Sequence, residues 1–225
     1  MISASHQGRG GTSMRNHFMS IRAATLSLLA AFMLLCVPTA AQAAKWFVDN
    51  SLGDLKPEEK KTPATPRPVQ LIFEFQRNGE PNPRATKEVK PWILDALKAT
   101  GAFTEVVEAP VAGGAVLSIK FNNVIAQEEL DKAKKDGFRA GLGFGLFGGV
   151  VATDRYDVAF EYLPGEGAAS VQTLVQHALH MKYGKKDVEI PGTQVKNVSE
   201  AVKMVVRQAT DHGINNLVSD PAFPQ

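Results

Sequence analysis

Two short runs of this chain, residues 69–76 and 115–124, place an apolar side chain at every second position, and this pattern constrains the fold more than any other feature. A period of two is typical of a β-strand that buries one face. In the second run Leu117, Ile119 and Phe121 share such a face. Because a sheet with one apolar face must bury it, the chain has to supply a second layer that covers the sheet.

Further strands are predicted at residues 103–108 and 156–163, where β-branched and aromatic residues gather. Residues 170–183 also alternate apolar and polar side chains, but the same window fits a helix, so both assignments stay open. Two amphipathic helices are predicted to form the covering layer. We therefore predict an α+β fold, a mostly antiparallel sheet with two amphipathic helices packed on one face.

The two helices are marked by their ends. The first spans about 84–100 and ends at Gly101, which supplies a C-terminal cap; Pro91 within it predicts either a kink or the true start of the helix. The second begins after Asn197, and Glu200 stands three residues later as in a capping box.

Residues 1–43 have the three parts of a secretory signal peptide. Arg15 and Arg22 form a basic region, residues 23–37 an apolar run, and Ala41-Gln42-Ala43 a signal peptidase site. The apolar run has about 15 residues, fewer than the roughly 20 that a membrane-spanning helix needs. We expect the leader to be removed and the working protein to begin near Ala44.

Two details of the leader stay open. Met14 opens a signal of ordinary length, so a start at Met14 is an alternative to a start at Met1. Cys36 ends the apolar run, where a lipid could be attached. A bacterial lipobox has Gly, Ala or Ser just before its cysteine, whereas Leu35 stands there. The sequence disfavours lipidation without deciding it.

Charge and cysteine content exclude several classes of function. The chain has 25 basic and 23 acidic residues, and the leader carries three of the basic ones and no acidic one. The mature part is therefore nearly neutral, so no nucleic-acid partner is predicted. Cys36 is the single cysteine and leaves with the leader, which excludes disulfides and thiolate metal sites from the mature chain.

The mature chain is predicted to have a linker and one domain. Residues 44–68 form an amino-terminal segment followed by a Pro-rich, charged stretch that favours an extended linker. Residues 69–220 form a single α/β domain, which contains the Gly-rich apolar segment 137–152.

That Gly-rich segment is the candidate interaction site. It contains a G-x-G-x-x-G pattern, but neither the preceding strand nor the following helix of a dinucleotide loop, so no cofactor is predicted. It is predicted either as a buried strand or loop, or as an element that inserts into a membrane or partner. The residues assigned to this interaction are Gly137, Gly141, Phe144, Gly145, Phe147 and Gly149.

No catalytic or metal-binding residue is predicted. His177 and His180 would point to opposite faces of a strand, and on a helix they would lack a nearby acid. The paired carboxylates Glu58-Glu59 and Glu128-Glu129 lie in charged stretches that are expected to be solvated. The sequence favours a protein that is not an enzyme and leaves open a site assembled from scattered residues.

Four segments carry a family resemblance: GAFTEVVEA, DRYDVAFEY, HALHMKYG and SEAVKMVVRQ. Across residues 69–218 the chain resembles small proteobacterial envelope proteins, many of them lipoproteins. Its layout also looks like the α/β domains of the curli secretion protein CsgG and the amino-terminal domain of TolB. The resemblance implies an envelope location and transfers no catalytic motif.

We therefore predict an exported envelope protein, periplasmic or associated with the outer membrane, that acts as a non-enzymatic binding or assembly domain. Its expected partner is another envelope protein or a second copy of the chain. One alternative is a membrane-inserting or oligomer-forming protein that uses segment 137–152. The other is an enzyme without recognisable motifs.

Overall fold

A computed structural model of the chain describes residues 44–125, 150–165, 167, 169–183 and 187–224. Within these ranges eight strands form one sheet, in the order β3-β2-β5-β6-β7-β1-β8, with β4 beside β2. β2 is parallel to β4 and β5, and the other neighbours are antiparallel. The strands are β1 (Lys45–Asp49), β2 (Arg67–Arg77), β3 (Glu80–Pro81), β4 (Phe103–Val107), β5 (Val116–Val124), β6 (Val150–Leu163), β7 (Val171–Tyr183) and β8 (Gly192–Val195).

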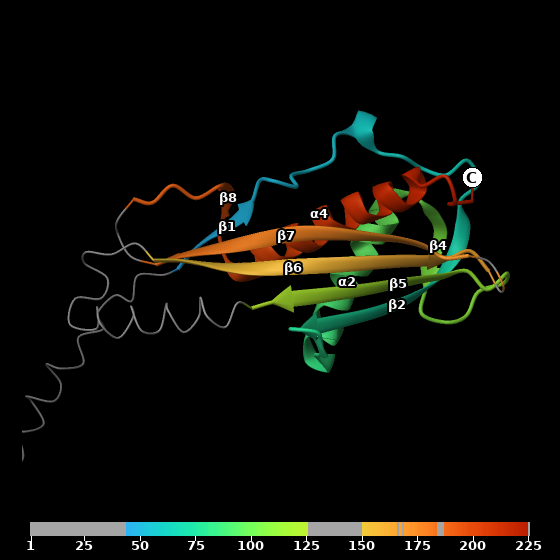
Figure 1. Cartoon of the computed structure of the whole chain (residues 1–225), viewed down its shortest axis with the longest axis horizontal. Helices are drawn as coiled ribbons and strands as arrows, with labels where there is room; N and C mark the ends of the chain where they lie inside the picture. The colour runs from blue at the N-terminus through green and yellow to red at the C-terminus, as the bar shows by residue number, and fades with distance from the viewer. Residues whose placement is uncertain (1–43, 126–149, 166, 168, 184–186, 225) are drawn as a thin grey trace, which may run out of the picture. The chain divides into compact units, whose positions relative to one another are not determined.

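Two helices, α2 (Pro83–Thr100) and α4 (Val198–Ser219), pack on the same face of this sheet, and a short 3-10 helix, η1 (Pro57–Glu59), precedes β2 (Figure 1). The predicted α+β fold, a mostly antiparallel sheet with two helices on one face, is confirmed. The core between the layers contains fully buried side chains from both, among them Leu117, Ile119, Phe121, Phe160, Ile93, Leu97, Ile214 and Leu217.

The helix ends follow the sequence signals. Gly101 has φ 69° and caps α2, while the Asn82 side chain accepts a hydrogen bond from the backbone of Ala85 at its start. α2 runs from Pro83 through Pro91, so Pro91 does not begin the helix. At α4 the Asn197 side chain accepts from the Glu200 backbone at 2.9 Å, as predicted for the cap. The Glu200 side chain accepts from the backbone of Lys196 at 3.0 Å instead of from Asn197, so the second bond of a capping box is replaced.

Residues 170–183, which the sequence left between strand and helix, form β7. Thirteen positions of β7 pair with β6, and four pair with β1. β1 thus lies inside the sheet, between β7 and β8, although the sequence predicted the domain to start near Val69.

α4 lies very close to the sheet at Gly213. A Cβ atom added there would lie 2.2 Å from a ring atom of Phe160, which is 1% exposed. Only glycine therefore fits at this point of the helix–sheet interface. Among the described residues, no helix has the length and hydropathy that crossing a membrane would require.

Candidate functional site

The face of the sheet that points away from α2 and α4 is the candidate site, and we call it the open face. It arises because β2, β5, β6 and β7 each turn alternate side chains away from the buried layer. The registers align these side chains in three rows across the strands. The rows are Ile72, Ser118, Glu161 and Gln172; Glu74, Lys120, Ala159 and Leu174; and Gln76, Asn122, Asp157 and Gln176.

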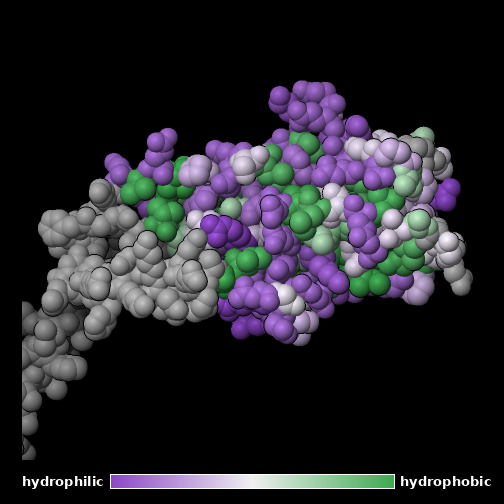
Figure 2. Space-filling view, in the orientation of Figure 1, coloured by the Kyte–Doolittle hydropathy of each residue, from purple (hydrophilic) through white to green (hydrophobic). Residues whose placement is uncertain are grey.

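Two large apolar side chains stand out on the otherwise polar open face. Leu174 is 58% exposed and Ile72 is 51% exposed. Figure 2, in the orientation of Figure 1, shows a largely hydrophilic surface with separate hydrophobic patches among the polar residues. Leu174 lies on β7 and Ile72 on β2, near one edge of the sheet, so they are two separate apolar positions on this face.

A hollow of about 440 Å³ lies beside Leu174. Its lining includes the small side chains of Ser118 and Ala159 and the longer polar side chains of Lys120, Glu161 and Gln172. Because Ala159 is the direct cross-strand neighbour of Leu174, a projecting side chain and a low point lie next to each other on one surface.

The polar residues of the open face form cross-strand pairs. Gln172 Nε2 donates to Glu161 Oε1 at 2.8 Å, and Gln176 Nε2 donates to Asp157 Oδ1 at 2.9 Å. Each carboxylate has further acceptor positions, and each amide oxygen can accept as well. The pairs therefore order these side chains and still present hydrogen-bonding groups outward.

A second cluster at one end of the open face centres on His180. Its Nε2 lies 2.8 Å from Asp49 Oδ2, and its Nδ1 lies 3.0 Å from Thr153 Oγ1. Burial raises the pKa of Asp49, but hydrogen bonds from Ser51 and His180 outweigh that effect and leave the pKa below its ordinary value. The hydroxyl, imidazole and carboxylate come from β6, β7 and β1, so the cluster ties β1 into the sheet.

His177 lies on the opposite face of β7 and contacts α4. The Ala178 backbone N–H donates to His177 Nδ1 at 2.9 Å, so the ring proton sits on Nε2 and is donated to Gln208 Oε1 at 2.7 Å. Burial lowers the pKa of His177. The two histidines thus point to opposite faces of a strand, as predicted for a strand, and cannot bind one ion together.

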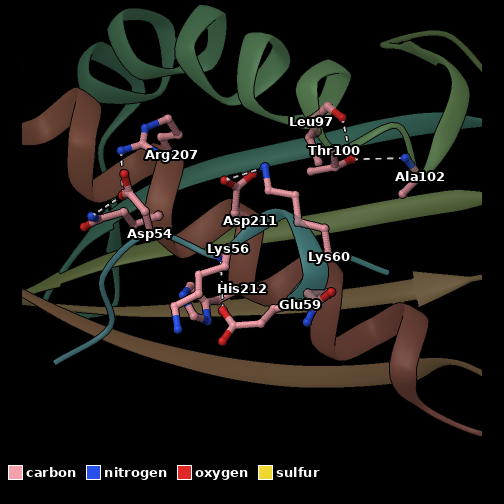
Figure 3. Close-up of polar contacts among 12 residues, drawn as sticks. Asp54, Lys56, Glu59, Lys60, Leu97, Thr100, Ala102, Arg207, Asp211 and His212 are labelled. Atoms are coloured by element: carbon pink, nitrogen blue, oxygen red, sulfur yellow. Dashed lines mark hydrogen bonds and ion pairs between the residues drawn. The ribbon is translucent and has the colours of Figure 1, made fainter. Parts of the chain in front are cut away.

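The His177 network continues into residues 50–61, which lie along α4 (Figure 3). Gln208 Nε2 and Arg207 both donate to Asp54 Oδ1, at 2.6 and 2.7 Å, and the bond from Gln208 is the main reason that the pKa of Asp54 is lowered. Lys60 pairs with the buried Asp211 at 3.5 Å. These contacts attach the charged segment 50–61 to the domain.

The predicted interaction segment cannot be compared with this geometry. Its residues all lie outside the described part of the chain: Gly137, Gly141, Phe144, Gly145, Phe147 and Gly149. Of segment 137–152 only residues 150–152 are described, and they form the start of β6. In the described ranges no group of three or more His, Cys, Asp and Glu side chains is placed to hold a metal ion.

The sequence prediction missed the open face itself. The sequence held one signal for this face. Ile72 and Leu174 are apolar residues at positions of alternating strands where polar residues are expected. An aliphatic residue in the polar phase becomes informative only when the cross-strand registers show which face it lies on and which side chains surround it.

Comparison with known proteins assigns no family. No family model matches the sequence, and the curated proteins contain no match. Among solved structures, a variant of the PelC dodecamer from Paraburkholderia phytofirmans is distantly similar, with a TM-score of 0.32, 14% identity, and coverage of 72% of this chain and 94% of that one.

A second PelC dodecamer structure from the same organism gives a TM-score of 0.27 at 12% identity and covers 81% of this chain and 98% of that one. A structure described only as an uncharacterized protein gives 0.26 at 9% identity, with 71% and 93% covered. These similarities are too distant to carry an argument about the function of this chain.

Proposed function

We propose that this chain is an exported protein of the bacterial envelope and that its open face is a binding or assembly surface. The leader in residues 1–43 supports export, because its basic region, apolar run and A-x-A site are those of a secretory signal. The surface is supported by one observation above others, the exposure of Leu174 beside a hollow on the open face, with Ile72 exposed on β2 as a second apolar side chain. A partner that removed both side chains from water would gain the hydrophobic free energy that the isolated chain forgoes.

The chemistry of the open face favours binding over catalysis. Glu161 and Asp157 each accept a hydrogen bond from an amide, and an amide is neither a base nor a nucleophile. Carboxylates and amides arranged in this way are suited to hydrogen bonding with a partner, around an apolar centre. Interfaces commonly combine an apolar core with a polar rim.

Two experiments in the producing bacterium test this proposal. Cell fractionation with intact-mass measurement should recover residues 44–225 from the envelope compartments. A photo-crosslinking amino acid in place of Leu174 should then give a covalent adduct in living cells. The same amino acid in place of Val198, which is 46% exposed at the start of α4, is the matched control and should give none.

Two results would count against the proposal. An unprocessed chain retained in the cytoplasm would contradict export. Absence of an adduct from position 174, or equal adducts from positions 174 and 198, would remove the open face as the contact surface.

A further inference from the structure

Resting on the proposed function, we infer that the open face binds a second copy of this chain, face to face, about a two-fold axis that runs along the strand direction between β6 and β7. In a two-fold interface the same patch is used by both subunits, so it must be complementary to itself. The three rows of side chains on β6 and β7 meet this requirement.

On the open face β6 presents Glu161, Ala159 and Asp157, and β7 presents Gln172, Leu174 and Gln176 directly opposite them. Each row therefore joins unlike partners. Two rows join a carboxylate to an amide, and the row between them joins the smallest side chain of the set to the largest apolar one. A rotation about the line between the strands places β6 of one copy over β7 of the other.

The central row provides the apolar contact. Leu174 of each copy comes to lie over Ala159 of the other, which lines the hollow of about 440 Å³. Both Leu174 side chains enter such a hollow at once, because the projecting and the low positions are adjacent on the same surface. This contact covers the most exposed of the large hydrophobic residues that the structure describes.

The outer rows select this axis over its alternative. Under the proposed rotation Gln172 faces Glu161 of the other copy, and Gln176 faces Asp157, so that amides oppose carboxylates. An axis across the strands would instead place Glu161 over Asp157 of the other copy. Opposed like charges at an interface are costly, so the axis along the strands is the favoured one.

The size of the face sets the expected strength. About this axis β6 and β7 of one copy overlie β7 and β6 of the other, while Ile72 on β2 lies outside the overlap. Two strands paired over thirteen residues span roughly 10 Å by 40 Å, or on the order of 400 Å² per copy. A stable specific interface buries about 800 Å² per partner. We therefore expect a reversible dimer that forms in the micromolar range rather than a permanent one.

A size exchange between the two central positions tests the inference by sedimentation equilibrium of the purified exported chain. Leu174→Ala removes the projecting side chain, and Ala159→Leu fills the space that Leu174 of the other copy occupies. Each change alone should therefore raise the dimer dissociation constant by about tenfold. The double variant Ala159→Leu/Leu174→Ala rebuilds the contact with its members exchanged and should return close to the unsubstituted value. Val198→Ala is the matched control and should have no effect.

The outcomes separate this inference from the proposed function. A chain that stays monomeric at all concentrations, or a double variant that dimerises no better than the single ones, overturns the inference. If Leu174 still gives an adduct with a different protein in cells, the binding surface stands and only the second copy is wrong. Circular dichroism of each variant checks that it is folded; both positions are exposed, so folding should be unaffected.

Discussion

Gly213→Ala tests the packing that places the open face, because Gly213 sets how closely α4 lies against the sheet. The added Cβ would lie 2.2, 2.5 and 2.6 Å from three ring atoms of Phe160, whereas carbon atoms in contact normally lie about 3.5–4.0 Å apart. Phe160 is 1% exposed, so its ring is enclosed by the core. The helix or the ring must therefore move by more than about 1 Å.

The magnitude follows from two opposing effects. Overpacking a well-filled core costs about 1–3 kcal/mol, and sometimes more. Replacing glycine by alanine inside a helix stabilises it by about 1 kcal/mol. Because the contact distance is far below the normal limit, we expect the upper part of the range to apply, which leaves a net destabilisation of about 1–2 kcal/mol.

Urea denaturation of the folded chain measures this change as a difference in the free energy of unfolding. The double variant Gly213→Ala/Phe160→Leu should recover part of the loss, because the shorter side chain makes room for the new methyl group. Ala99→Gly, at an exposed position in the last turn of α2, controls for helix propensity and should cost less than the about 1 kcal/mol of a helix interior. If Gly213→Ala instead stabilised the protein, α4 could not lie at the distance described here.

Substitutions at three further positions test the polar contacts. Burial lowers the pKa of His177 below its ordinary 6.5, so below that pH the unfolded chain binds a proton that the folded chain does not. The free energy of unfolding should therefore fall as the pH drops below about 6.5, by at most about 1.4 kcal/mol per pH unit. His177→Gln should show a smaller dependence when unfolding is measured between pH 7.5 and pH 5. Asp54→Ala removes the acceptor for Gln208 and Arg207, so it should cost about 1 kcal/mol and speed proteolysis within residues 50–61, whereas Asp54→Asn should preserve more of both. Asn197→Ala should cost about 1 kcal/mol in thermal or urea unfolding, and Asn197→Ser should retain most of the cap.

Local signals in the sequence predicted the elements whose causes are local. These elements depend on residues that are close together in the sequence. They are the caps at Gly101 and Asn197, the alternating strands and the apolar faces of the two helices. β7 was ambiguous because Leu174 and Ala178 place apolar side chains in the polar phase of the strand. The window therefore also has helical spacing, at Val171, Leu174, Val175, Ala178 and Leu179.

Long-range pairing could not be predicted from those signals. β1 joins the sheet through partners more than 130 positions away in the chain, and nothing in KWFVD identifies them. The attachment of residues 50–61 depends in the same way on Arg207, Gln208 and Asp211. The open face could not be predicted for the same reason, because it forms only when four strands pair in register.

The most direct test of the open face as an assembly surface is sedimentation equilibrium of two matched variants, Leu174→Asp and Val198→Asp. Both introduce a carboxylate at an exposed aliphatic position, the first on the open face and the second at the start of α4. We predict that Leu174→Asp is folded and monomeric at concentrations where the unsubstituted chain and Val198→Asp dimerise. Identical association of all three proteins would contradict the account.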